Sequence, residues 1–265
     1  MPAKKYPKLM LATPTLDGRV SAEYAQSLSG LKTALYQSSI NFSMQLHIGN
    51  SLLAGARNHL ADDFLRSEAD WLLMVDSDIA YRPEDVLAAL PHLEDAVIGF
   101  PCSKKFAKWD RVAKTLRDNP DFPADGIPAI LGDANFHLGV SDYLRPNDYG
   151  LAKVKWIGTG VMLVARSTLQ KIMADNPDDK TMVNGKIIHE FFRYDMEWAE
   201  KDGVKFKDYA GEDVSFCNLA RKSGFKVYAK LDALTTHVGF SLYRFDATAV
   251  ARLKNVPSQL ESQKK

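Results

Sequence analysis

The chain has 265 residues, of which 46% are hydrophobic and 25% charged, and its formal net charge at pH 7 is +1. These values are typical of a globular protein with a substantial core, and so small a net charge excludes a global field that attracts nucleic acid or acidic membranes. Cys102 and Cys217 are the two cysteines and fit no metal-ligand spacing, which favours a reducing compartment. Because we find neither an apolar signal core nor an apolar run of about 18 residues, we expect a cytoplasmic protein without membrane insertion. The oligomeric state is not predicted.

The N-terminal part of the chain alternates between predicted strands and predicted helices. Apolar or alternating runs predict strands at 9–12, 42–48, 71–75 and 96–100, with a turn-rich loop at 13–18. Amphipathic spacing predicts a helix capped by Ser21 and running to about Tyr36, a second beginning at Asn50 or Ser51, and a third opened by Pro83. This alternation is typical of a parallel α/β sheet with right-handed crossovers.

The C-terminal part is less regular. Residues 118–150 are rich in Pro, Asp, Asn and Gly, and we expect an irregular loop region there. Strands are predicted at 154–157, 161–164 and 226–228, a helix capped by Ser167, and another helix opening at Gly211-Glu212-Asp213. Residues 254–265 are predicted to form a frayed tail. We expect one domain over residues 1–265.

The most informative segment is the apolar run 71–75 followed by Asp76-Ser77-Asp78. The run predicts a strand buried on both faces of a sheet, and ligands bind beyond the carboxyl ends of such strands. Two carboxylates at that position suit a hard divalent cation that carries a substrate's phosphates. The alternative is that Asp76 or Asp78 caps the helix at Pro83.

The ordered motifs resemble those of GT-A-type glycosyltransferases, including compact bacterial and bacteriophage enzymes. The match is carried by 71–78, the segment Trp156-Ile157-Gly158-Thr159-Gly160, Gly211-Glu212-Asp213 and His237, with Arg57-Asn58 on the second helix. The resemblance implies a Rossmann-like α/β fold with a mostly parallel central sheet flanked by helices. Residues 8–110 would form the nucleotide-sugar half, and residues 151–245 the acceptor and catalytic half.

The resemblance also implies a metal ion, Mn²⁺ or Mg²⁺. Asp78 is the expected direct ligand, Asp76 contacts ribose or a metal-bound water, and His237 is the C-terminal ligand. Imidazole and carboxylate can share a Mn²⁺ coordination sphere. The alternative for His237 is a hydrogen-bonded surface residue at a strand end.

Catalysis is assigned by the same resemblance to Gly211-Glu212-Asp213. Inverting transfer needs a carboxylate that takes the acceptor proton, and Asp213 is the expected base. Glu212 would bind acceptor hydroxyls. The alternative is that both acids only stabilise the N-terminus of their helix.

Weaker signals complete the donor site. The remaining donor contacts implied by the resemblance are Thr13, Pro14, Thr15, Arg57, Ser77, Gly158, Thr159 and Gly160. Each of these residues has a purely structural alternative, as part of a turn or as a solvated helix residue. Arg57 could also either bind a phosphate or orient Asp76.

Together these features predict a metal-dependent transfer of a sugar from a nucleoside diphosphate, with UDP and inversion favoured. The acceptor could be a glycan, a small molecule or a hydroxymethylated DNA base. A basic rim for DNA would consist of Lys104, Lys105, Lys108, Arg111 and Lys114.

Three other functions remain open. A nucleotidyltransferase usually has a glycine-rich basic loop after its first strand, which residues 13–18 lack. A haloacid-dehalogenase-type phosphatase expects Thr or Val at Ala80 and an acid at His137. A non-catalytic nucleotide- or carbohydrate-binding protein need not keep Asp76, Asp78, Asp213 and His237 together.

Overall fold

The computed structural model describes residues 6–137 and 146–239, so the predicted frayed tail lies outside the described residues. Seven strands form a central sheet in the order β2-β1-β3-β9-β5-β14-β7. Their bounds are β1 Lys8–Thr15, β2 Asn41–Ile48, β3 Trp71–Val75, β5 Ala96–Gly99, β7 Leu151–Lys153, β9 Val161–Ala165 and β14 Lys226–Lys230. β9 runs antiparallel between β3 and β5, and β7 runs antiparallel to β14. The other five strands share one direction, which confirms the expected α/β fold with a mostly parallel sheet.

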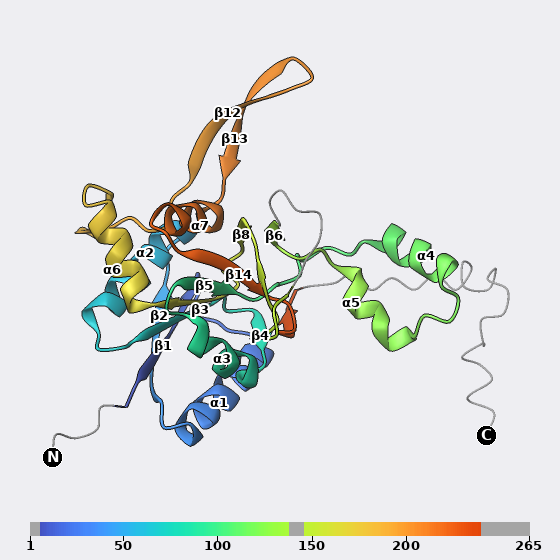
Figure 1. The fold of residues 1–265 in the computed structure, drawn as a ribbon, viewed down its shortest axis with the longest axis horizontal. Helices are drawn as coiled ribbons and strands as arrows, with labels where there is room; N and C mark the ends of the chain where they lie inside the picture. Colours follow the sequence, from blue (N-terminus) through green and yellow to red (C-terminus); the bar gives the residue numbers. More distant parts are fainter. Residues whose placement is uncertain (1–5, 138–145, 240–265) are drawn as a thin grey trace.

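Helices cover both faces of this sheet (Figure 1). One face packs on α1 (Ala22–Gln37) and α3 (Pro83–Ala89), which the turn η1 (Leu90–His92) follows. The other face packs on α2 (Leu53–Arg66), α6 (Arg166–Asp175) and α7 (Glu212–Lys222). Two hydrophobic clusters result, one on each side of the sheet.

The central strands are apolar at every position because both faces are buried. In β3, Leu73 and Val75 belong to the cluster under α1 and α3, whereas Leu72 and Met74 belong to the cluster under α2, α6 and α7. Successive side chains of a strand point to opposite faces, so a continuous apolar run is needed here. The predicted doubly buried strand is therefore confirmed.

Strand β1 is longer than predicted and includes part of the expected loop. Its pairing with β3 stops at Ala12, but its pairing with β2 continues to Thr15. Pro14 lacks a backbone N–H, and it is tolerated where one side of the strand has no partner.

Two helix starts differ from the predictions. The second helix begins at Leu53, because the Asn50 carboxamide accepts the N–H of Leu52 (2.9 Å) in the preceding turn. Ser167 lies inside α6 instead of capping it. In contrast, Ser21 caps α1 as predicted, by accepting the N–H of Tyr24.

The guanidinium of Arg166 satisfies the C-terminal end of α2. It donates four hydrogen bonds of 2.7–3.0 Å to carbonyl oxygens at that end and in the segment after it, those of Phe64, Leu65, Ser67 and Ala69. The last carbonyls of a helix have no partner within the helix, so this contact fixes α2 to the start of α6.

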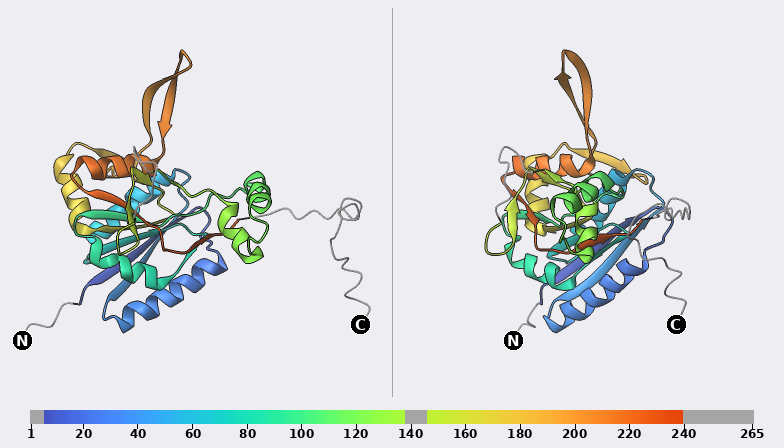
Figure 2. Two further views of the ribbon diagram at one scale, coloured as in Figure 1. Left: turned by 45° about the vertical axis from the view of Figure 1, so that its right-hand side comes forward. Right: turned by 90° about the vertical axis from the view of Figure 1, so that its right-hand side faces the viewer.

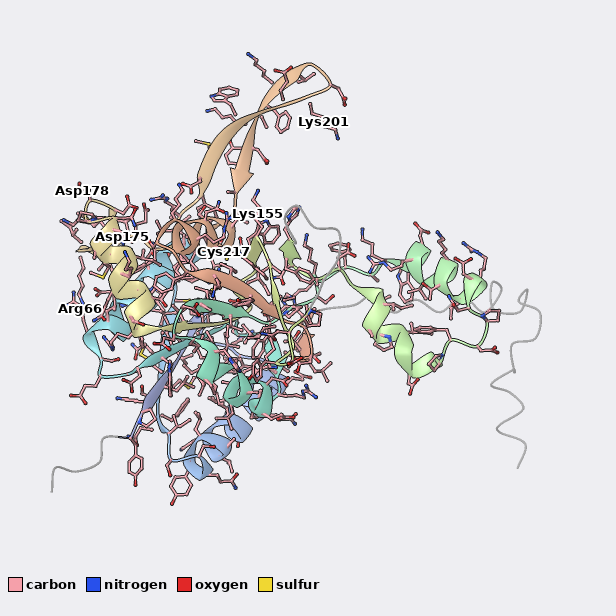
Figure 3. All side chains as sticks on the ribbon, viewed as in Figure 1. Arg66, Lys155, Asp175, Asp178, Lys201 and Cys217 are labelled. Carbon is pink, nitrogen blue, oxygen red and sulfur yellow. The ribbon has the colours of Figure 1, made fainter. Side chains whose placement is uncertain are left out.

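Smaller strand pairs lie outside the central sheet. Two of them lie near it, β4 (Ile79–Tyr81) with β15 (Thr235–His237) and β6 (Phe136–His137) with β8 (Trp156–Ile157). The other two are hairpins, β10 (Lys180–Val183) with β11 (Lys186–His189) and β12 (Asp195–Lys201) with β13 (Val204–Ala210). Figures 1 and 2 show β12–β13 as an arm that projects away from the sheet and helices, with the labelled Lys201 near its tip in Figure 3.

The region predicted to be irregular is partly ordered. After α4 (Trp109–Asp118) it contains η2 (Ala124–Gly126), α5 (Ile127–Leu131) and β6, while residues 138–145 lie outside the described residues. These elements are short, which is why the sequence shows no clear period. Among the helices of the described ranges, none has the length and apolarity needed to span a bilayer.

Candidate active site

The acidic segment forms a tight turn at the carboxyl end of β3. The Asp76 N–H donates to the Gly160 carbonyl (3.0 Å), and the Val238 N–H donates to the Asp78 carbonyl (2.8 Å). The helix at Pro83 has Arg82 at its N-cap position and no side-chain cap. The alternative capping role for Asp76 or Asp78 is therefore wrong.

A buried arginine joins this turn to the helix that carries the predicted base. Arg57 is 1% exposed; its Nη2 donates to Asp76 Oδ1 (2.7 Å), and its Nη1 donates to Glu212 Oε1. Burial lowers the pKa of Arg57, but Asp76 and Glu212 raise it more, so the group stays a cation. The alternative of a solvated helix residue is wrong, and the predicted contact with Asp76 is present.

Asp78 contacts two other groups. Its Oδ1 lies 3.3 Å from Nε2 of His237, and its Oδ2 accepts a hydrogen bond from Lys105. Burial raises the pKa of Asp78, but the hydrogen bonds from His237 and Lys105 lower it to about 2. The hydrogen bond with Asp78 raises the pKa of His237 despite partial burial. Antiparallel pairing of β15 with β4 places these side chains together, because His237 pairs with Ile79.

The side chains of Asp78 and His237 offer an oxygen and a nitrogen atom that fit a divalent cation, such as one that also binds phosphates. Nδ1 of His237 lies 2.7 Å from the Ser103 carbonyl, which can only accept, so Nδ1 carries a proton and Nε2 faces Asp78. Within the described ranges, no group of three His, Cys, Asp or Glu side chains could hold a metal alone. One carboxylate and one imidazole suffice where a diphosphate and water complete the coordination.

A cavity of about 360 Å³ opens beside these groups, and we call it the donor cavity after the donor contacts that the sequence analysis predicts there. It is lined by six of the predicted donor and metal residues, together with residues that the sequence analysis missed, most of them between β2 and the start of α2. Its lining residues are Pro14, Thr15, Leu16, Asn50, Ser51, Leu53, Asp76, Ser77, Asp78 and His237. Asn50 could have been recognised, since it follows the carboxyl end of a parallel strand.

Five predicted donor contacts do not line the donor cavity: Arg57, described above, and Thr13, Gly158, Thr159 and Gly160. Thr13 is fully buried, and its hydroxyl shares a hydrogen bond of 2.6 Å with the Tyr24 hydroxyl. Gly158, Thr159 and Gly160 directly precede β9; the Gly160 carbonyl accepts the N–H of Asp76 in the acidic turn, and Thr159 is buried. A Cβ on Gly158 would lie 1.8 Å from the Asn135 amide nitrogen, so this glycine is required for packing.

The predicted catalytic pair begins α7. Glu212 binds Arg57, and the negative charge of Asp213 also raises the pKa of Arg57. The Asp213 Oδ1 accepts the N–H of Val214 (2.8 Å). Helix α7 thus presents two carboxylates next to one buried cation, which is more than stabilisation of a helix end requires.

The predicted basic rim is largely paired with acids. Lys105 binds Asp78, whereas Lys108 and Arg111 both bind Asp133. A second cavity of about 610 Å³ lies between this segment and α5, and shares His237 with the donor cavity. Paired charges weaken the attraction of this surface for a polyanion.

Neither a family model nor a curated protein matches the sequence. Solved structures match at low similarity. A197 from STIV is 14% identical with a TM-score of 0.47, and the match covers 88% of this chain and 86% of that chain. A Drosophila galactosyltransferase mutant in complex with manganese, UDP-Gal and xylobiose is 12% identical with a TM-score of 0.44, covering 96% and 83%. S. aureus TarS in complex with UDP-GlcNAc is 12% identical with a TM-score of 0.40, covering 88% and 60%. The activities and ligands named are those proteins' own.

Proposed function

We propose that the chain transfers a sugar from a nucleoside diphosphate to an acceptor hydroxyl, with inversion at the anomeric carbon. The observation that carries this proposal is the buried bridge of Arg57 between Asp76 and Glu212, next to the donor cavity. A metal-binding turn and a general-base helix are needed side by side in such a reaction, and Arg57 holds them together. Residues 8–110 would serve mainly the donor, and residues 151–245 mainly the acceptor.

The donor cavity is suited to the nucleotide. Its volume of about 360 Å³ and its mixture of apolar and hydrogen-bonding groups are those of a small-molecule site. Thr15 and Asn50 line the same cavity as the acidic turn and would bind the base and ribose. UDP is the favoured nucleotide on the sequence resemblance.

Asp78 and His237 would hold Mn²⁺ or Mg²⁺, as their donor atoms allow. When bound, the metal supplies positive charge to the departing diphosphate. Lys105, which now binds Asp78, is placed to donate to the same phosphates.

The transfer step uses Asp213 as the base. The acceptor hydroxyl gives its proton to the Asp213 carboxylate, and its oxygen forms a bond to the anomeric carbon. The bond from that carbon to the diphosphate oxygen breaks, and its electron pair leaves with the nucleoside diphosphate. The ion pair with Arg57 holds the Glu212 side chain nearby, where its carboxylate oxygens would accept hydrogen bonds from acceptor hydroxyls.

The donor half of this proposal is tested by thermal shift with UDP, GDP, CDP and dTDP, each with Mn²⁺, Mg²⁺ or EDTA. A ligand that binds only the folded state stabilises it by about 2.7 kcal/mol at a hundredfold excess over its Kd. We expect one diphosphate to raise Tm only with metal, and Asp78→Asn to abolish that rise. Asp110→Asn, an exposed aspartate of α4, is the control. No shift with any nucleotide would contradict the proposal.

The catalytic half is tested with Asp213→Asn and the nucleotide sugar identified in this way. We expect donor binding to persist while slow donor hydrolysis, with water as acceptor, falls at least about a hundredfold. A hydrolysis rate near that of the wild type would place the base elsewhere.

A further inference from the structure

A third cavity, of about 350 Å³, shares the lining residue Asn50 with the donor cavity. It is bounded by the N-terminal end of α2, the β10–β11 hairpin and the segment before the arm. The lining of this cavity includes Asn50, Leu52, Met182, Asn184, Glu190 and Tyr194, and we call it the Tyr194 cavity.

The Tyr194 cavity is next to the proposed catalytic groups. Burial and the charge of Glu212 raise the pKa of the Tyr194 phenol, while a hydrogen bond to the backbone of Ala54 lowers it. Arg57 and Asp213 also act on this phenol. The chain leaves the cavity at Tyr194 to form the arm and returns from the arm at Gly211, directly before Glu212 and Asp213.

The wall that carries Glu190 and Tyr194 is held rigidly against α2. Asn58 is buried, and its carboxamide accepts the N–H groups of Phe191 (2.9 Å) and Phe192 (2.8 Å) and donates to the Phe192 carbonyl (2.8 Å). Phe192 in turn stacks on Phe216 of α7. A preformed wall reduces the ordering cost of binding.

One polar group that this cavity offers to a ligand is the Glu190 carboxylate. Neighbouring Arg193 is already bound to Asp179 (2.8 Å) and Asp195 (3.0 Å). Within the described part of the chain, by contrast, no group donates a hydrogen bond to the Glu190 carboxylate. An ionised carboxylate accepts only, so its ligand must donate hydrogen bonds.

Charge and shape define the ligand further. Of the charged residues that line the cavity, Arg193 is bound to Asp179 and Asp195 outside the lining, and Glu190 adds a further carboxylate. This group of four charges is negative on balance and disfavours phosphate. Tyr194 is 53% exposed, and Leu52 and Met182 present further apolar surface beside it. A ring with one apolar face and several hydroxyls matches this combination, because the face can stack on Tyr194 while the hydroxyls donate to Glu190.

We propose that the Tyr194 cavity is the acceptor subsite and binds a neutral sugar ring, which makes a glycan and not DNA the acceptor. This inference rests on the proposed function for the direction of transfer, since the bound ring would present its hydroxyl toward Asp213. The binding of the sugar itself does not depend on donor or metal.

The test is saturation-transfer NMR with neutral disaccharides (lactose, cellobiose, maltose and xylobiose) and with glucose 6-phosphate as the anionic probe. At least one neutral disaccharide should give signals with the wild type, and glucose 6-phosphate should give none. Tyr194→Ala and Glu190→Gln should each weaken disaccharide binding at least about tenfold. Tyr36→Ala and Glu84→Gln, exposed residues of α1 and α3, are matched controls and should bind as the wild type does.

The same variants are assayed for the UDP-dependent rise in Tm. Tyr194→Ala and Glu190→Gln should retain this rise, and its presence also shows that both variants are folded. Failure of UDP to bind the wild type would contradict the proposed function while the disaccharide signals still decide the subsite. Binding of no neutral disaccharide, binding that survives both substitutions, or preference for the anionic probe would overturn the subsite.

Discussion

At the residue scale, the buried Arg57 is the group on which the site depends. Arg57→Ala leaves the carboxylates of Asp76 and Glu212 close together without a cation, and removal of one partner of a buried ion pair costs about 3–5 kcal/mol. Arg57→Lys should cost less but not be neutral, because an ammonium cannot reproduce the two-sided fork of a guanidinium. Urea unfolding measures both.

A rescue variant separates the charge effect from lost packing. Arg57→Ala combined with Asp76→Asn and Glu212→Gln removes the repulsion and should recover part of the lost free energy of unfolding. A cost below about 1 kcal/mol for Arg57→Ala alone would show that the bridge does not stabilise the protein.

A second residue-scale prediction concerns pH and His47. Its ring lies 4.4 Å from that of His59, near Asp63, and its Nε2 is buried with no hydrogen-bond partner within the described residues. Burial and the neighbouring His59 lower the pKa of His47 below its ordinary 6.5, against the opposing effect of Asp63. The unfolded chain therefore takes up the proton more readily, and stability is lost as pH falls through about 6.5.

Urea unfolding at about pH 7.5 and about pH 5.5 checks this prediction. His237, whose pKa is raised, contributes in the opposite direction but equally in both proteins. Relative to the wild type, His47→Gln should therefore be the more stable of the two at the lower pH once their stabilities at the higher pH are matched. An equal loss in the variant would assign the pH dependence to other groups.

At the element scale, replacing a large side chain by alanine should have very different effects in the helices packed on the central sheet and in the β12–β13 arm. Phe216 in α7 is fully buried against Phe192, and Phe216→Ala should cost about 3–5 kcal/mol of the free energy of unfolding. Trp198 in β12 is 73% exposed, and Trp198→Ala should change it by no more than about 0.5 kcal/mol. A large loss on Trp198→Ala would mean that the arm is packed in solution.

Both hairpins were missed by the sequence analysis although a local signal exists. Asn184-Gly185 and Asp202-Gly203 all have positive φ (50°, 77°, 53° and 77°), which is the backbone of the tight turns that join antiparallel strands. Asn-Gly and Asp-Gly pairs are the strongest short signals for such turns. The helices of the N-terminal half were easier to predict, since their apolar spacing is continuous over several turns.

At the scale of the whole molecule, the two cysteines lie on opposite sides of the central sheet and can be used to follow the unfolding of each side. Cys102 belongs to the cluster under α1 and α3, and Cys217, labelled in Figure 3, to the cluster under α2, α6 and α7. Burial raises the pKa of each thiol to about 12, so neither is ionised near neutral pH.

We expect neither thiol to react with iodoacetamide at about pH 8 in the folded protein, because the thiolate is the reactive form. Since one sheet separates and supports both clusters, the thiols should become reactive over the same range of urea concentration. Mass spectrometry of labelled peptides measures each site. Labelling of Cys217 well before Cys102 would show that the two sides of the sheet open independently.

The sequence by itself determined the α/β alternation, the doubly buried strand β3 and the position of the acidic turn at its carboxyl end. These features depend on the spacing of apolar residues within short segments, which local periodicity records. Tertiary structure alone decided that Arg57 meets Glu212, 155 positions away, that Lys105 and His237 share Asp78, and that Asn50 lines two cavities. Such contacts follow from strand order and from side chains of distant segments meeting in three dimensions, and no local pattern encodes them.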